Sequence, residues 1–281
     1  MLIPNVLELL DPVGAPLPVL YTLPHSGRIY PADFNSALGP DILRRAEDAY
    51  VDLLLEGAAA QGATVLKALF PRAYLDANRT EDDLDPNLLA PGAPVTAGEK
   101  SLLGIGLVRR VVTPEYPIYD RLLTLDEIEN RIRTYYRPYH DALSQTLSGL
   151  HARFGQAVFI DWHSIKSVGN AATPDGAGAK RADFVLGDRF GETCAPELTQ
   201  AVVNYLSGQG YTVTVNQPYA GGATLRRYGT PLQGIHGLQI EMNRALYLDE
   251  KSVSMTDDAP RLRAALAGVL PALVSFLGET G

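Results

Sequence analysis

The sequence predicts one α/β domain with a mixed, mostly parallel sheet and helices on both faces. Short apolar runs alternate with amphipathic helical patterns along all 281 residues. Several of these runs are apolar at every position, which is typical of strands that are buried on both faces of a sheet. Since no linker-like stretch divides the chain, we expect a single domain over residues 1–281.

The first half of the chain should contribute three strands and one long helix. Strands are expected at 18–23, 63–69 and 73–75, because each is a short apolar run that ends in polar or turn-forming residues. A helix is expected over 42–60, where apolar residues recur every three or four positions and glycines lie near its end. The acidic, proline-bearing stretch 81–94 should form a loop.

Helices and strands alternate more regularly in the second half. A long helix should begin after Thr124, which forms a capping-box pattern with Glu127, and run to Phe154 with Pro138 as its point of interruption. The glycine- and alanine-rich stretch 167–180 is typical of a mobile loop. The other expected elements are strands at 157–160, 182–186, 211–215 and 238–242 and helices at 196–206 and 260–277.

The composition argues against several kinds of partner and site. The net charge is −8, so we expect neither nucleic acid nor an anionic membrane as a partner. The single cysteine, Cys194, excludes an intrachain disulfide framework and a multi-cysteine metal site. The N-terminal segment lacks the basic region and long apolar core of a secretory signal, and we expect no membrane span. These features favour a cytoplasmic enzyme.

Two of the five histidines, His25 and His163, directly follow apolar strand patterns. Open α/β sheets bind ligands at the carboxyl ends of their strands, so these two imidazoles can converge although they are far apart in the sequence. Two histidines and a carboxylate are a common set of zinc ligands, and Asp161 is placed to orient the ring of His163. The alternative for either histidine is a structural role in the core.

Glu241 lies inside an apolar strand pattern, where a carboxylate is costly unless it is paired or serves a site. Beside a metal-bound water it can act as a general base, and the alternative is a buried ion pair with Arg244 or Arg226. Arg79, Arg110 and Arg226 each adjoin a strand end or a glycine-bearing turn. Their planar guanidinium groups suit bidentate binding of a carboxylate, and a surface ion pair is the other interpretation for each.

A series of short segments from about residue 20 to residue 250 carries a family resemblance. They are Pro24–Gly27 with Tyr30-Pro31, Glu47-Asp48 before Val51-Asp52, Arg72–Arg79, Gly106 with Arg110, Pro138–His140, Asp161–Ser164, Asp183 with Leu186-Gly187, Gly221–Gly229, and Gln239–Glu241 with Tyr247–Glu250. In this order they resemble the N-formylglutamate amidohydrolase family, which is in turn similar to zinc carboxypeptidases and aspartoacylase-like deacylases. One such segment is a weak signal, and the ordered set is specific.

The resemblance implies a zinc-exopeptidase-like (phosphorylase/hydrolase-like) fold that holds one divalent ion, zinc. It makes His25 and His163 metal ligands. The wider group carries a glutamate three residues after the first of these histidines, and this chain has Arg28 there. The carboxylate ligand must therefore come from elsewhere, and Asp48 is our choice because its segment resembles the family's. The alternatives are Asp33 and Asp161.

By the same resemblance Glu241 is the base, Asn78 and Arg79 hold a substrate carboxylate, and Arg110 and Arg226 add further carboxylate contacts. The implied reaction is hydrolysis of the formamide bond of N-formyl-L-glutamate to formate and L-glutamate, as a cytoplasmic step of histidine degradation on a small dicarboxylate. Two alternatives stay open: a deacylase of another N-acyl amino acid or a carboxypeptidase-like hydrolase of acidic peptides, and a non-catalytic carboxylate-binding protein. The sequence sets neither the oligomeric state nor whether 167–180 closes over the substrate.

Overall fold

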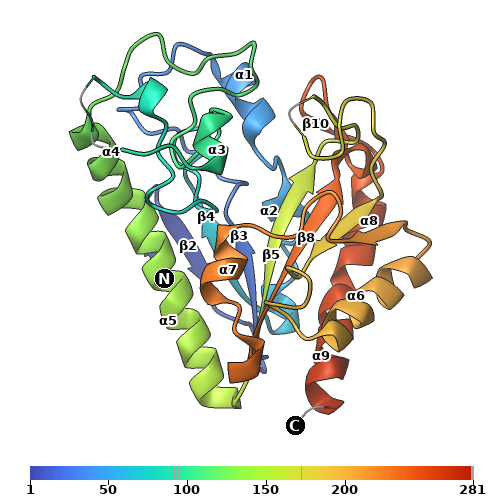
Figure 1. Ribbon diagram of the computed structural model, residues 1–281. Coiled ribbons are helices and arrows are strands. Elements are labelled where there is room, and N and C mark those ends of the chain that lie inside the picture. The colour runs from blue at the N-terminus through green and yellow to red at the C-terminus, as the bar shows by residue number, and fades with distance from the viewer. Residues whose placement is uncertain (92, 94, 172, 280–281) are drawn as a thin grey trace.

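An eight-stranded mixed sheet in the order β1-β2-β4-β3-β5-β8-β6-β7 forms the centre of the computed structural model (Figure 1). The structure describes residues 1–91, 93, 95–171 and 173–279. Its four central strands are parallel: β4 (Thr64–Ala68), β3 (Val19–Leu23), β5 (Ala157–Ile165) and β8 (Ile235–Asn243). The outer strands are β1 (Leu2–Ile3), β2 (Leu7–Leu10), β6 (Phe184–Gly187) and β7 (Val213–Val215). β2 and β6 join the parallel centre in antiparallel fashion, so the predicted mixed α/β sheet is confirmed.

The two longest strands, β5 and β8, position the polar residues of the sheet. All of β5 is buried, and its register with β8 runs from Ala157 opposite Ile235 to Ile165 opposite Asn243. Both strands are longer than the predicted apolar runs, because pairing continues past Ile160 in β5 and begins at Ile235, before Leu238, in β8. Figure 1 shows the two arrows ending at the same edge, where the loops that carry α1, α3 and β10 gather.

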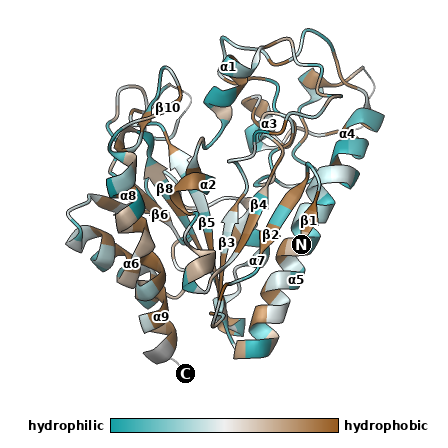
Figure 2. Ribbon diagram, turned by 180° about the vertical axis from the view of Figure 1, so that it is seen from behind, coloured by the Kyte–Doolittle hydropathy of each residue, from teal (hydrophilic) through white to brown (hydrophobic). Residues whose placement is uncertain are grey.

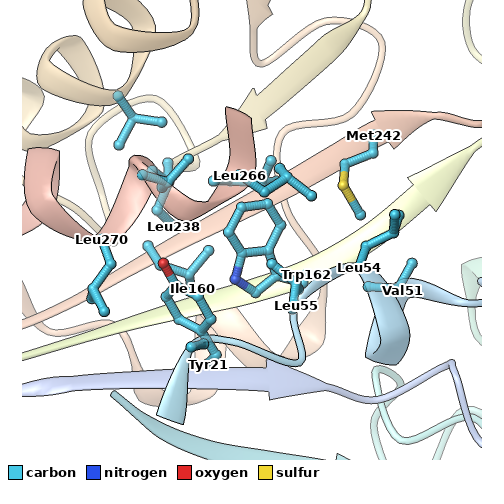
Figure 3. Close-up of a cluster of buried hydrophobic side chains, with 14 of the residues drawn as sticks. Tyr21, Val51, Leu54, Leu55, Ile160, Trp162, Leu238, Met242, Leu266 and Leu270 are labelled. Carbon is cyan, nitrogen blue, oxygen red and sulfur yellow. The ribbon is translucent and has the colours of Figure 1, made fainter. Parts of the chain in front are cut away.

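Helices cover both faces of the sheet, as predicted. On one face α2 (Val51–Leu54), α6 (Pro196–Gly208), α8 (Ala259–Ala267) and α9 (Val269–Glu279) enclose a core around Trp162 (Figure 3). The Trp162 ring meets the Tyr21 ring edge-on, with the centroids 5.3 Å apart. On the other face α5 (Arg137–Phe154) packs over a second core that includes Phe159.

The predicted long helix from Thr124 to Phe154 forms, but without the interruption expected at Pro138. It consists of α4 (Leu125–Arg131), a π-helical segment (Ile132–Tyr136) and α5, and Thr124 and Glu127 make the predicted capping box. Pro138 is tolerated because it lies in the first turn of α5, directly after the π-helical segment has rearranged the backbone.

The helix predicted over 42–60 is wrong as a continuous element. The chain forms α1 (Pro40–Leu43), a 3₁₀ turn (Arg44–Ala46), α2 and a second 3₁₀ turn (Ala59–Gln61). The interruption falls at Glu47–Tyr50, where Tyr50 has a φ of 65°. There the backbone N–H of Asp48 donates to the His25 carbonyl at 2.9 Å, so tertiary contacts override the helical periodicity.

The strand predicted at 73–75 is also wrong, because this buried run forms a turn in which the N–H groups of Tyr74 and Leu75 donate to the Pro71 carbonyl.

The N-terminal strands β1 and β2 were not expected. Within the stretch 81–94, Pro86–Leu88 form a 3₁₀ turn, and Gly92 and Pro94 lie outside the described residues. The other short elements are α3 (Glu99–Leu102), α7 (Ala223–Tyr228), 3₁₀ turns at Pro231–Gln233 and Arg244–Leu246, and the two-stranded sheet of β9 (Leu248–Asp249) and β10 (Ser254–Met255).

The glycine-rich loop 167–180 is tied at its base. Val168 and Lys180 form a bridge, and Arg181 pairs with Asp175 at 2.7 Å. Position 172 lies outside the described residues, and closure of this loop over a substrate stays untested.

Ala259–Leu277 is long and apolar enough by composition to cross a membrane, which we did not expect from the sequence. In the fold this segment is α8 and most of α9, and it packs onto the sheet with Leu262, Leu266 and Leu270 buried. Figure 2 shows the strongly hydrophobic colouring of α9 against the mixed colouring of α5. A side chain at Gly268, between the two helices, would collide with the Tyr205 hydroxyl.

Candidate metal centre

Three buried side chains meet at the carboxyl ends of β3 and β5. The Nδ1 atoms of His25 and His163 lie 3.0 Å apart, and Oδ2 of Asp48 lies 3.2 Å and 3.0 Å from them. His25 follows β3, His163 belongs to β5, and Asp48 reaches the pair from the interruption between α1 and α2. Each of the three is at most 3% exposed. The structure thus brings together the two predicted histidines and the carboxylate chosen for them.

A second pair of carboxylates sets the proton positions on the two rings. Nε2 of His25 lies 2.6 Å from Oδ1 of Asp76, and Nε2 of His163 lies 2.9 Å from Oδ2 of Asp161. Because a carboxylate only accepts hydrogen bonds, each contact places a ring proton on Nε2 and turns an Nδ1 lone pair toward Asp48. The predicted contact of Asp161 with His163 is confirmed, and the matching role of Asp76 was not foreseen.

The three facing atoms, Nδ1 of His25, Nδ1 of His163 and Oδ2 of Asp48, are stable so close together only with a positive charge between them. Two Nδ1 lone pairs and a carboxylate oxygen at about 3 Å repel one another unless a proton or a cation intervenes. Burial alone would lower the pKa of His163, but the carboxylates of Asp161 and Asp48 raise it well above its usual value. Two imidazole nitrogens and one carboxylate oxygen, each ring backed by a second carboxylate, fit a divalent cation such as zinc.

Arginines keep the carboxylates of the cluster ionised. Arg244 donates to Oδ1 of Asp48 at 3.1 Å, and Arg72 pairs with Oδ2 of Asp76 at 2.9 Å. Burial opposes ionisation, but the close contacts with the His163 and His25 rings and the charge of Arg72 hold the pKa of Asp48 well below its ordinary range. The charge of Arg72 does the same for Asp76 against the effect of burial. Both carboxylates therefore carry their charge at neutral pH.

Glu241 lies directly opposite His163 in the register of β5 and β8. Its Oε1 accepts a hydrogen bond from Nε2 of Gln239 at 2.9 Å. Arg244 is engaged by Asp48, and among the described residues no ion pair includes Glu241, so the alternative of a buried ion pair is not realised. Burial raises the pKa of Glu241 above its ordinary value, although the charge of His163 opposes the shift. A carboxylate with a raised pKa is suited both to accept a proton and to return it.

Asn78 holds the histidine side of the cluster in place. Its Oδ1 accepts from the backbone N–H of Thr224 at 2.9 Å and from the Thr224 hydroxyl at 3.0 Å. Its Nδ2 donates to Oδ2 of Asp161 and lies 3.1 Å from Nε2 of His163. A Cβ at Gly222 would lie 2.4 Å from Oδ1 of Asn78, which explains the glycine there. The amide is thus engaged within the protein, and its predicted contact with substrate stays a prediction.

The three predicted carboxylate-binding arginines lie at different distances from this cluster. Arg79 is anchored to the carbonyls of Ile105 and Asn78, and its Nη2 lies 3.8 Å from Oδ2 of Asp76. Arg110 forms a 2.6 Å ion pair with Asp85, which already neutralises its charge. Arg226 is exposed on α7. The structure therefore brings only Arg79 of the three into contact with the cluster, and the substrate contacts of all three stay predictions.

Arg109, the neighbour of Arg110, is the cation that we missed. It is 7% exposed, its Nη1 lies 4.0 Å from Oδ2 of Asp76, and its hydrogen bond to the Val111 carbonyl is long at 3.4 Å. Burial and the nearby charge of Arg72 lower the pKa of Arg109 to about 9. A buried guanidinium with only long polar contacts to the protein can bind an anion. In the sequence, two adjacent arginines after an apolar pair give no sign of which one turns inward.

Comparisons with known proteins point to one family. The model of the N-formylglutamate amidohydrolase family matches residues 17–248. Curated relatives called N-formylglutamate deformylase from Pseudomonas aeruginosa and Pseudomonas putida are each 28% identical, covering 92% and 94% of this chain and 94% of each relative. A crystal structure of N-formylglutamate amidohydrolase from Ralstonia eutropha JMP134 aligns with a TM-score of 0.89 and 39% identity over 99% of this chain and 100% of that one. A structure from Agrobacterium tumefaciens, at 21% identity and a TM-score of 0.67 over 98% of this chain and 96% of that one, shares the fold.

Proposed function

Because the chain belongs to the N-formylglutamate amidohydrolase family, and is therefore a hydrolase of carbon–nitrogen bonds other than peptide bonds, we propose that it hydrolyses N-formyl-L-glutamate to formate and L-glutamate with one zinc ion. The observation that carries the proposal is the triangle of His25 Nδ1, His163 Nδ1 and Asp48 Oδ2 with sides of 3.0–3.2 Å. Glu241 lies on the strand next to it.

His25, Asp48 and His163 would hold the ion, with Asp76 and Asp161 fixing the orientation of the two rings. Three protein ligands leave the fourth position of a tetrahedral zinc site open to water or substrate. When bound, the ion lowers the pKa of a water toward about 7 and polarises the formyl oxygen.

Glu241 moves the proton. Its carboxylate takes a proton from the water that attacks the formyl carbon, and it delivers that proton to the nitrogen that leaves as the carbon–nitrogen bond breaks. The products are formate and L-glutamate, whose amino group is now free. The raised pKa of Glu241 suits both steps, and the hydrogen bond from Gln239 fixes the carboxylate for them.

Cations would balance the negative charge of the substrate and of the transition state. We expect Arg79, with Asn78 beside it, to hold a substrate carboxylate. Arg110, which is paired with Asp85, and the exposed Arg226 stay predictions for such a contact. Arg109 joins this set because it is a buried cation whose contact with the Asp76 carboxylate is long, at 4.0 Å. A cation so placed stabilises the oxyanion that forms as water adds to the formyl carbon.

The wider setting of the proposal follows the family resemblance. We expect a cytoplasmic enzyme of a single domain over residues 1–281 that acts in histidine degradation on a small dicarboxylate. The net charge of −8 supports a small-molecule substrate over nucleic acid or an anionic membrane as the partner.

The test is a hydrolysis assay across a panel of N-acyl amino acids, run with and without a chelator. We expect N-formyl-L-glutamate to be the best substrate and the chelator to abolish turnover. A faster rate with another acyl group would assign the enzyme to the deacylases of that group. If no member of the panel is hydrolysed while L-glutamate still binds, the chain is a carboxylate-binding protein instead.

A further inference from the structure

A cavity of about 360 Å³ is lined in part by Arg244. The guanidinium of this residue donates to Asp48 at 3.1 Å, so the cavity lies within one side chain of the metal cluster. We propose that this cavity binds the side-chain carboxylate of the substrate, with Lys166 and Arg45 as its anion-binding groups. The inference rests on the proposed function and adds a specificity pocket to it.

The charge on the cavity wall is strongly positive. Four cations line the cavity against one carboxylate, Glu250. That carboxylate is in part engaged, because its Oε1 accepts from the backbone N–H of Ser167 at 2.7 Å. The four cations are Arg45, Lys166, Arg244 and Lys251. The cavity therefore favours an anionic ligand.

Lys166 and Arg45 have no ion-pair partner in the part of the chain that the structure describes, and the Arg45 guanidinium lies 5.6 Å from the centroid of the Tyr116 ring. Among the described residues no ion pair or hydrogen bond engages the Lys166 ammonium, and the buried Nε of Arg45 has no partner. Burial and the charge of Arg244 lower the pKa of Lys166, a cost that a bound carboxylate would relieve.

Arg244 forms part of the cavity wall and is held by hydrogen bonds. Its Nε donates to the Ser164 hydroxyl at 3.0 Å, and its Nη2 donates to Asp48 and to the Glu47 carbonyl. These bonds fix the guanidinium beside the cluster, and Arg244 also lines the cavity.

N-formyl-L-glutamate carries its two carboxylates at different distances from the formamide. Its α-carboxylate is attached to the carbon that bears the formamide nitrogen, so it stays beside the cluster, where Arg79 and Arg109 lie. Its side-chain carboxylate is two methylene groups farther away. Lys166 directly follows the last residue of β5, so it lies at the same strand end as His163.

The experiment compares N-formyl-L-glutamate with N-formyl-L-glutamine, which has nearly the same shape and a neutral side chain. In the zinc-loaded enzyme, Lys166→Met should lower kcat/KM for the glutamate substrate by about 10- to 100-fold, because a charge-assisted hydrogen bond is lost. The same variant should change kcat/KM for the glutamine substrate by less than about threefold. Arg45→Met should act in the same direction. Lys67→Met is the matched control, since Lys67 pairs with Glu8 on the neighbouring strand.

Calorimetric titration with L-glutamate and L-glutamine separates this inference from the proposed function. Wild-type protein should prefer L-glutamate, and Lys166→Met should remove the preference even if the chain hydrolyses neither N-formyl compound. An equal loss of kcat/KM for both substrates, or an undiminished preference for L-glutamate in Lys166→Met, would overturn the inference. Glu250→Gln should tighten L-glutamate binding, because it removes the carboxylate from the cavity wall.

Discussion

Asp76→Asn tests how the protein presents His25 to a metal ion. Oδ1 of Asp76 receives the Nε2 proton of His25 at 2.6 Å, while Oδ2 pairs with Arg72 at 2.9 Å. An asparagine has one oxygen for these two donors, so its NH₂ group must face either Arg72 or His25. If it faces His25, the ring proton moves to Nδ1 and blocks the donor atom that points toward Asp48. If it faces Arg72, the histidine keeps its tautomer but loses a charged partner.

Either outcome weakens metal binding by about 10- to 100-fold, the usual effect of removing a carboxylate behind a ligating histidine. This corresponds to about 1.4–2.8 kcal/mol of binding free energy. The assay is a competition titration of zinc with a chromophoric chelator at neutral pH. Asp33→Asn is the control, because Asp33 accepts from the Tyr74 hydroxyl. Zinc affinity of Asp76→Asn within about twofold of wild type would refute the orienting role.

Three further predictions concern the base, the buried cation and the pH dependence of stability. Glu241→Gln should lower kcat by at least about 100-fold while zinc stays bound by elemental analysis, and a loss of zinc instead would make Glu241 a ligand. Arg109→Ala should lower kcat/KM for N-formyl-L-glutamate by at least about tenfold and leave zinc content unchanged, whereas wild-type kinetics would remove Arg109 from the site. Burial lowers the pKa of His140 from 6.5 to about 4, so the unfolded chain binds a proton at pH values where the folded protein does not. Stability should therefore fall by up to about 3 kcal/mol as the pH drops from about 6.5 to 4. In urea unfolding, His140→Gln should flatten this dependence of stability on pH. An unchanged dependence in the variant would show that His140 does not cause it.

The central strands and their histidines could be predicted because their signal is local. An apolar run followed by a polar residue marks a strand end, and parallel strands bring such ends to one edge, so His25 and His163 converge. Glu241 follows by the same reasoning, since β8 pairs with β5 in register. These residues owe their positions to regular secondary structure.

Features that depend on tertiary contacts could not be predicted in this way. The segment around Asp48 has helical periodicity, yet hydrogen bonds to His25 and Arg244 hold it open. Arg109 and Arg110 are adjacent and chemically identical, and only the packing around them decides that Asp85 takes one while the cluster takes the other. The buried run 73–75 satisfies the apolar pattern of a strand but forms a turn.

A crystal structure of the zinc-loaded protein, with diffraction recorded on both sides of the zinc absorption edge, tests whether the two imidazoles and Asp48 share one ion. We expect a single strong anomalous peak about 2.0–2.2 Å from Nδ1 of His25, Nδ1 of His163 and Oδ2 of Asp48, with the carboxylate of Glu241 nearby but unbound. An anomalous peak held by other residues, or full turnover by protein shown to contain no divalent metal, would contradict the metal centre described above.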